Sequence, residues 1–381
     1  MTALLAFMCV LSGTLLIPAV RPFMAWAAPG NESAAHAFMA LNMLGAVLAA
    51  PIVVRLTSKV RSPARLIAGL ALADGVLLAL LTCGLPLNLM LAIRTVQGAL
   101  NVGALSVLLG AAPTGEQAGR GSRYGLLGAA MMLGVAAGAP LGALCLTLGA
   151  RAPVLAGALL LLAVAAVVPR VAIERVAPSP SSWRNVPFLP MAWVFAERFA
   201  IGLFVVTFSF HARQCLGISD RRVGLLLTAF LLPFGGAVYP AGMLTDRWGA
   251  AKVAVLGLLT YGAAFLALPS ASEMQLLPLM LLLGLSSAAV FAAAMREAAK
   301  GANVAARIAA MSGLSSAGSL GMLLGTALAG IASAAFRAHG QPAPAAHSLI
   351  FVVGGVAQLA VATSTFALAT FAPRLARSIR S

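Results

Sequence analysis

The sequence is poor in charged residues, which make up only 9% of its 381 positions. A soluble domain carries roughly 25% charged residues and about half apolar ones. Here 61% of the residues are hydrophobic, and the mean hydropathy is +1.00. This balance excludes a soluble globular protein and predicts an integral membrane protein embedded in a lipid bilayer.

Cysteine and histidine are also scarce, with four of each. The cysteines are scattered without a CxxC pair or a nearby group of histidines. Disulfide frameworks and metal sites need closer and more regular spacings, so we predict no metal site. The sequence also lacks a glycine-rich phosphate loop and a nucleophile–histidine pair. We therefore predict no cofactor and no enzyme activity.

Acidic residues are few, and the 25 Lys and Arg against nine Asp and Glu give a net charge of +16. In a soluble protein this excess would favour nucleic-acid binding. Here the basic residues lie in short segments between apolar runs, where Lys and Arg mark the cytoplasmic side of a membrane. We therefore predict no nucleic-acid partner.

Long apolar runs dominate the chain, and twelve fit the length of about 20 residues that a membrane-spanning helix needs, although the sixth and the ninth are short. With the N-terminus inside, 17 of the 25 Lys and Arg lie on the inner side and 5 on the outer side. Together with the Ala-, Leu-, Gly- and Arg-rich composition, this predicts a bacterial inner-membrane protein with both termini in the cytoplasm. The predicted spans are residues 4–27, 35–54, 66–83, 86–109, 124–148, 153–168, 189–211, 223–244, 253–268, 276–294, 308–335 and 349–371.

A polar segment with the sequence Pro-Ser-Pro-Ser-Ser follows the sixth span and is typical of a linker. The two sides of this linker show a weak repeat, because residues 123–128 (Arg-Tyr-Gly-Leu-Leu-Gly) resemble residues 307–313 (Arg-Ile-Ala-Ala-Met-Ser-Gly). Repeated halves are a common plan for transporters. We predict an N-terminal six-helix bundle over residues 1–169, a cytoplasmic linker over 170–188 and a C-terminal six-helix bundle over 189–381.

The loop after the eighth span carries a recognisable motif. Residues 242–252 read Gly-Met-Leu-Thr-Asp-Arg-Trp-Gly-Ala-Ala-Lys, which resembles the G-x-x-x-D-R-x-G-x-x-K loop of the major facilitator superfamily. A carboxylate at Asp246 can rest against the positive N-terminus of a neighbouring helix, which would be the fifth helix near Arg123 or the eleventh near Arg307. The loop after the second span departs from the pattern, because Arg55 replaces the aspartate. The predicted conformational latch comprises Gly242, Asp246, Arg247, Gly249, Lys252 and Arg123.

Two further segments carry the same resemblance. Residues 94–98 (Arg-Thr-Val-Gln-Gly) are similar to the family's R-x-x-Q-G, and residues 134–142 (Gly-Val-Ala-Ala-Gly-Ala-Pro-Leu-Gly) resemble the G-x-x-x-G-P-x-x-G element of its drug/proton antiporter branch. The resemblance implies an all-α membrane protein with twelve transmembrane helices in two pseudo-symmetric six-helix bundles. Small residues let such helices pack closely. The predicted packing residues are Gly98, Gly134, Gly138, Pro140 and Gly142.

Charged residues inside the spans are the candidates for a functional site, because such charges are costly and usually face a pathway. Glu197 and Asp74 are the candidate proton-coupling acids. Glu197 is favoured, because the seventh helix commonly lines the cavity of this fold. Glu197 and Arg198 are adjacent and are expected to need different partners. The candidate substrate-binding residues are Arg94, Gln97, Arg21 and Arg198.

The resemblance implies a secondary transporter that works by alternating access, and we predict a monomer that exports small organic compounds in exchange for protons. Two alternatives stay open. The intramembrane arginines also suit uptake or exchange of an organic anion. The altered first loop and the acid-free first helix suit a non-transporting assembly factor or receptor. A transporter requires a water-filled cavity lined by Arg94 and Glu197, whereas a dry seam favours the scaffold.

Overall fold

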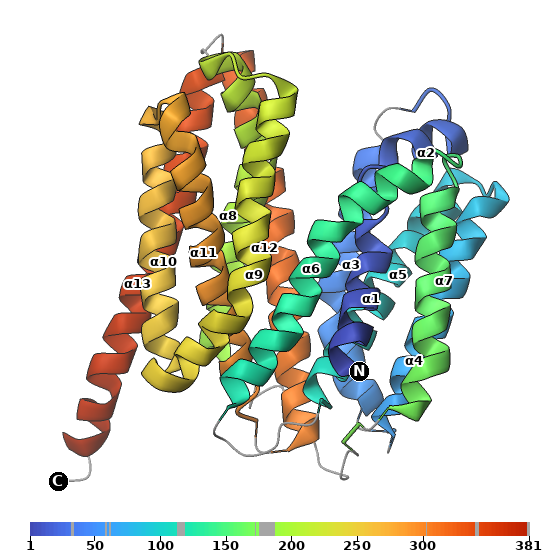
Figure 1. Cartoon of the computed structure of the whole chain (residues 1–381), viewed down its shortest axis with the longest axis horizontal. Helices are drawn as coiled ribbons and strands as arrows, with labels where there is room; N and C mark the ends of the chain where they lie inside the picture. The colour runs from blue at the N-terminus through green and yellow to red at the C-terminus, as the bar shows by residue number, and fades with distance from the viewer. Residues whose placement is uncertain are drawn as a thin grey trace. The chain divides into compact units, whose positions relative to one another are not determined.

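A computed structural model describes the chain except for residues 32–33, 58, 61, 113–118, 172, 175–186, 302, 340–342 and 379–381. The described residues are almost entirely helical (Figure 1). Among them, eleven helices are long and apolar enough to cross a membrane, and a twelfth apolar helix is shorter. The all-α membrane fold expected from the sequence is thus confirmed.

The described residues form two compact units. The first comprises residues 1–117, 126–187 and 298–319, and the second comprises residues 118–125, 188–297 and 320–381. The predicted linker over 170–188 lies largely outside the described residues. Two helices belong to both units: the first turns of α6 (Arg120–Leu146) lie in the second unit, and the first half of α12 (Val304–Ala338) lies in the first. The sequence does not anticipate this exchange of helix starts.

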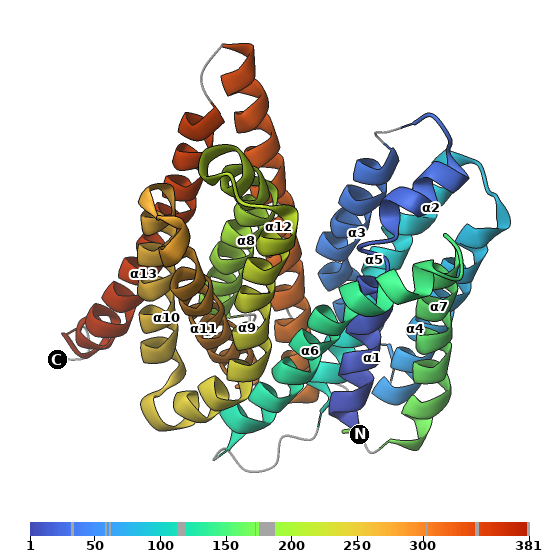
Figure 2. The same ribbon diagram turned by 45° about the horizontal axis from the view of Figure 1, so that its top comes forward.

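The described part of the first unit contains α1 to α7 and the first half of α12. Within it, α3 packs along α5, and α4 packs on α5 and α7 (Figure 2). A buried apolar cluster that includes Phe23, Phe38 and Leu161 lies within this unit. The helices other than α6 and α12 are α1 (Thr2–Thr14), α2 (Val20–Ala27), α3 (Ala34–Thr57), α4 (Pro63–Leu80), α5 (Leu87–Gly110) and α7 (Ala152–Val167).

The first predicted span, residues 4–27, is not one continuous helix. Helix α1 ends at Thr14, and α2 begins at Val20 after a turn. Pro18 lies in this turn and has no N–H group to donate to an α-helical hydrogen bond. The turn is instead closed by tighter bonds, such as Ala19 N to Leu16 O at 2.9 Å. The prediction of one uninterrupted first span was therefore wrong.

The second unit contains α8 to α11, α13 and the second half of α12. Helix α13 packs against both α8 and α10. Trp193 on α8 is fully buried and donates to Thr365 Oγ1 on α13 at 2.9 Å. The bounds are α8 (Phe188–Leu216), α9 (Asp220–Trp248), α10 (Ala250–Ala267), α11 (Glu273–Ala298) and α13 (Ala343–Ser378).

Glycines mark the closest approaches between helices in both units. In the first unit, a Cβ on Gly98 would lie only 1.9 Å from the Asn42 carbonyl oxygen, so α5 and α3 touch backbone to backbone. In the second unit, a Cβ on Gly284 would lie 2.3 Å from the Phe230 carbonyl oxygen, at the contact of α11 with α9. No larger side chain fits at either crossing without moving backbone.

The small-residue stripe of α6 faces α1 and the turn that follows it. A Cβ on Gly134 would lie 2.9 Å from the Phe7 carbonyl oxygen, and one on Gly138 would lie 2.2 Å from Thr14 Oγ1. Gly142 approaches the Leu15 carbonyl oxygen equally closely, and Pro140 lies within the helix. The Thr14 hydroxyl also donates to the Gly134 carbonyl at 2.9 Å. The stripe therefore acts as a packing face within the first unit.

Candidate functional site

A cavity of about 250 Å³ lies in the first unit among α1, α3, α4 and α5. Helix α5 contributes three polar side chains to it, from Arg94, Gln97 and Asn101. These residues are three and seven positions apart, a spacing that places them on one helix face. Asn42 of α3 and Asp74 of α4 add to the polar lining, as do Ser12 and Thr14 of α1.

Arg94 is buried in the wall of this cavity, with 5% of its surface exposed. Its Nη1 donates to Gln97 Oε1 at 3.3 Å, and its Cζ lies 4.8 Å from the centre of the Phe38 ring. This ring contact is a cation–π interaction that partly compensates for lost hydration. Among the residues that the structure describes, Arg94 Nε has no hydrogen-bond partner. The guanidinium therefore retains an unused donor.

Asp74 is the carboxyl group of the same cavity and is 2% exposed. Its Oδ2 accepts a hydrogen bond from Asn101 Nδ2 at 3.1 Å, and its backbone carbonyl accepts one from Gln97 Nε2 at 3.4 Å. The charges of Asp74 and Arg94 attract each other. They are the two charged residues in the lining, so the ionised pair leaves the cavity with no net charge.

Glu197 and Arg198 form a different arrangement in the second unit. The Glu197 side chain is fully buried, accepts a hydrogen bond from the Ser287 hydroxyl and lies 3.3 Å from Arg198 Nε. The Arg198 guanidinium also lies over the rings of Phe234 and Phe291. The expectation that the adjacent charges need different partners was wrong, because the long arginine side chain folds back onto its neighbour.

The cavity joins only some of the residues that the sequence singled out. It is lined by Arg94, Gln97 and Asp74, whereas Glu197, Arg198 and the exposed Arg21 are not among its lining residues. Sequence reasoning missed two amides, Asn42 and Asn101. Asn101 had a signal, because it continues the face of α5 that begins at Arg94. Asn42 is a lone amide in an apolar helix and had none.

Asp246, at the end of α9, binds the start of α6. It accepts hydrogen bonds from the backbone N–H groups of Gly121 at 2.8 Å and Ser122 at 2.9 Å, and from the Ser122 hydroxyl at 3.0 Å. Arg296 Nε of α11 lies 3.2 Å away. An anion at a helix N-terminus is stabilised by unpaired N–H groups and by the helix dipole. The sequence left two helix starts open as partners of Asp246, one near Arg123 and one near Arg307. In the described structure Asp246 binds the first of these, at the start of α6.

The glycines of this motif permit the contact. A Cβ on Gly242 would lie 2.3 Å from the Gly121 carbonyl oxygen, and Gly249 has a φ of 86°, a left-handed conformation that favours glycine. The side chains of Arg123, Arg247 and Lys252 are exposed. The Asp246 carboxylate, Arg296 and the glycines therefore make the contact.

Within the first unit, the start of α12 is held by an arginine instead of a carboxylate. Arg307 Nε donates to the Gly110 carbonyl at the C-terminal end of α5, at 3.1 Å. The same guanidinium forms an ion pair with Glu174. A Cβ on Gly110 would lie 2.4 Å from Ile308 Cα, so α12 lies directly against this helix end. A cation is favoured there, because the C-terminus of a helix is negative.

Comparison with known proteins agrees with this architecture. The family model of the Major Facilitator Superfamily matches residues 191–378. Among curated proteins, no sequence matches this chain. The solved structure of the human organic anion transporter MFSD10 (TETRAN) has a TM-score of 0.73 and 16% identity, covering 96% of this chain and 97% of that one. The E. coli fucose:proton symporter FucP, solved as a variant, has a TM-score of 0.69 and 14% identity over the same shares.

At such low identities the structural likeness establishes the fold alone. That fold extends over nearly the whole chain, and the family model matches about half of it, within the C-terminal part. Of the three motifs that resemble the family's signatures, residues 242–252 lie inside the matched segment, and residues 94–98 and 134–142 lie before it. This multi-pass membrane protein therefore belongs to the major facilitator superfamily of transporters.

Proposed function

We propose that this protein is a proton-coupled secondary transporter that exports small organic compounds by alternating access. The observation that carries the proposal is the cavity whose lining includes the polar side chains of Asp74, Arg94, Gln97, Asn101 and Asn42. Its volume of about 250 Å³ is slightly below the roughly 300–1,000 Å³ typical of ligand pockets, which suits a small solute. Placing polar side chains inside an apolar helix bundle costs free energy. Contact of these groups with a solute best explains why they are there.

Asp74 is preferred to Glu197 as the proton-coupling group. Both carboxyl groups are buried, but only Asp74 lines the cavity. Glu197 already has Arg198 as a neutralising partner and the Ser287 hydroxyl as a donor. A group that carries protons must exchange them with water or with the solute. The position of Asp74 in the cavity lining therefore favours Asp74 for this role.

The charges of the cavity predict how proton and solute are coupled. An uncompensated buried charge is unfavourable, and the ionised forms of Asp74 and Arg94 compensate each other. A cationic solute therefore binds best beside ionised Asp74 and displaces its proton, which is antiport. An anionic solute binds best when Asp74 is protonated and Arg94 lacks a counter-charge, so anion and proton move together.

The second candidate function is uptake or exchange of a small organic anion. It is favoured by the guanidinium of Arg94 in the cavity lining, since guanidinium groups bind carboxylates well. The similarity in fold to a human organic anion transporter fits this candidate. The two candidates share one site and differ in the charge of the solute.

Asp246 is proposed to act as the conformational latch of the cycle. Its hydrogen bonds with the start of α6 and its contact with Arg296 belong to one state, and their loss would release α6 for the other. Alternating access requires such contacts, which form in one arrangement and break in the other.

Flux measurements in proteoliposomes test the proposal. Protein is reconstituted with an imposed pH gradient and supplied with organic cations, neutral compounds or organic anions. We expect proton-driven flux of one class and its loss in Asp74→Asn by more than about 100-fold, the scale of a positioned proton carrier. Glu197→Gln is the matched control and should keep most of the flux. Loss of coupling in Glu197→Gln but not in Asp74→Asn would overturn the assignment, and flux of no class would favour a scaffold.

A further inference from the structure

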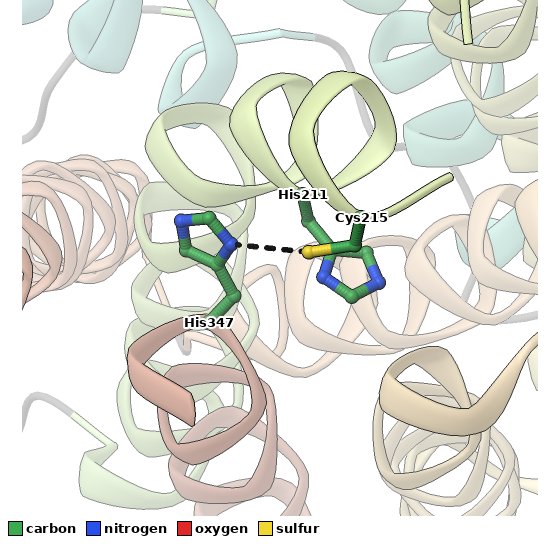
Figure 3. A group of neighbouring side chains, drawn as sticks. All are labelled: His211, Cys215 and His347. Atoms are coloured by element: carbon green, nitrogen blue, oxygen red, sulfur yellow. Dashed lines mark hydrogen bonds between the residues drawn. The ribbon is translucent and has the colours of Figure 1, made fainter. Parts of the chain in front are cut away.

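Three metal-ligating side chains meet in the second unit, away from the residues discussed so far. His211 and Cys215 are four positions apart on α8, so they share one helix face. His347 belongs to the first turns of α13. One ligand atom from each of the three lies within 4.8 Å of the others. Figure 3 shows the three side chains gathered between the two helices.

Both histidines are buried, and in the part of the chain that the structure describes His211 lacks a hydrogen-bond partner. His211 is 4% exposed, and neither of its ring nitrogens has a hydrogen-bond partner among the described residues. His347 is 5% exposed, and its Nδ1 lies 3.9 Å from Cys215 Sγ, a weak contact at most. Buried polar groups in native proteins are nearly always paired, and an unpaired one can indicate an ion that is not seen. The imidazole of His211 thus points to a ligand.

The surroundings fit a metal better than a proton relay. The ring centres of His211 and Phe351 lie 5.3 Å apart, with the ring planes at 90°. The ring centres of His211 and His347 lie 5.8 Å apart, with the planes at 82°. Two imidazoles and a thiol in an apolar setting are the donors that zinc prefers, at Zn–N distances of about 2.0–2.1 Å and Zn–S distances of about 2.3 Å. Donor atoms around one such ion lie roughly 3.3–3.6 Å apart, so modest side-chain rotations would complete the set.

We propose that His211, Cys215 and His347 bind one zinc ion, or a related borderline transition-metal ion, that joins the end of α8 to the start of α13. The thiol loses its proton to water, and the resulting thiolate supplies the third ligand. Three protein ligands leave one coordination position open for water or a solute group. The proposal is independent of the proton-coupled transport proposed above, because it involves other residues in the other unit.

Cobalt titration of the purified full-length protein in detergent tests the site. Chelator-treated protein is titrated with Co²⁺, whose bond to a thiolate gives a charge-transfer absorption band. We expect the band to saturate at one ion per chain and to disappear when Zn²⁺ is added. Cys215→Ser should abolish the band, and His347→Gln should weaken binding more than about 10-fold, since even outer-shell changes cost 10–100-fold. The matched controls Cys83→Ser and His36→Gln should bind as the unaltered protein does.

A second measurement needs no variant and covers the case in which a variant fails to fold. Zn²⁺ should protect Cys215 from alkylation in the unaltered protein, as read by mass spectrometry of its peptide, and leave labelling of exposed Cys83 unchanged. Zn²⁺ should also raise the melting temperature, as a ligand bound to the folded state does. Absence of the cobalt band, its persistence in Cys215→Ser, or unprotected labelling of Cys215 would overturn the proposal.

Discussion

Each unit holds a buried acid near an arginine of the membrane spans, Asp74 with Arg94 and Glu197 with Arg198, but the two pairs differ in what surrounds them. In the first unit, Asp74 and Arg94 come from different helices and line a common cavity. In the second, Glu197 and Arg198 are neighbours in sequence, and aromatic rings and the Ser287 hydroxyl enclose them. The difference teaches that burial of a charge alone does not place that charge beside a cavity. A pair that lines a cavity can meet a solute, whereas the charges of Glu197 and Arg198 already meet each other.

Replacing either arginine should have the largest effect, and solute binding should show the difference between the two acid–arginine pairs. Arg94→Ala leaves the Asp74 carboxylate buried without its counter-charge, and breaking such a pair costs about 3–5 kcal/mol. It should also abolish solute binding. Arg198→Ala should cost a similar amount, because it leaves the fully buried Glu197 carboxylate without its counter-charge, but it should leave solute binding intact. Thermal unfolding and equilibrium binding measure both effects.

The double variant Asp74→Asn with Arg94→Met is the control for stability. It removes both charges, so much of the lost stability should return while solute binding stays absent. If Arg198→Ala abolished binding and Arg94→Ala did not, the contrast between the units would be reversed.

The glycine crossings offer a test of what the two units share. Gly98→Ala should destabilise the protein by about 1–3 kcal/mol, the usual cost of overpacking, because the new Cβ meets the Asn42 carbonyl. Gly284→Ala should cost a similar amount in the second unit, where the Phe230 carbonyl is the obstacle. Both are measured as shifts in thermal unfolding.

Gly69→Ala is the matched control for these substitutions. Gly69 lies within α4, and a Cβ there would meet nothing within 4 Å. An alanine should therefore stabilise the helix by about 0.5–1 kcal/mol. Equal effects at Gly98 and Gly69 would contradict the close helix crossing.

The smallest expected change concerns the contacts that hold the helix starts. Asp246→Asn keeps a hydrogen-bond acceptor but loses the charge that faces the start of α6, which is worth about 0.3–2 kcal/mol. Arg296 also loses its ionic partner. We expect a modest fall in melting temperature and a shift in the conformational equilibrium, read from the labelling rate of a cysteine introduced at Ser122.

Asp246→Glu keeps the charge and is the control for this substitution. It should retain more of the unaltered labelling rate than Asp246→Asn does. An unchanged rate in Asp246→Asn would mean that the carboxylate does not act as a latch.

Much of the fold follows from the sequence, because apolar run length and loop motifs are local properties. The break after Thr14 was missed, since hydropathy is continuous there and Pro18 is a single residue. The exchange of the starts of α6 and α12 between units depends on distant contacts, such as that of Arg307 with Gly110, which no local pattern reports.

The site was only partly predictable. The motif around Arg94 and Gln97 was readable. Depth in the span could not show that Asp74 lines the cavity and Glu197 does not, because the cavity depends on how several helices pack. The histidine–cysteine group was missed for a similar reason. His211 and Cys215 are close in sequence, but His347 is 132 residues beyond Cys215, and its place beside them follows from the packing of α13 on α8.

The assignment of residues 298–319 to the first unit has a consequence for biosynthesis. A nascent chain inserts its early helices long before these residues leave the ribosome. The first unit therefore becomes complete only when most of the second has been made, and Arg307 can reach Gly110 only then. An N-terminal half expressed alone would lack a part of its own core contacts, so co-expression of the two halves should be needed for either to accumulate.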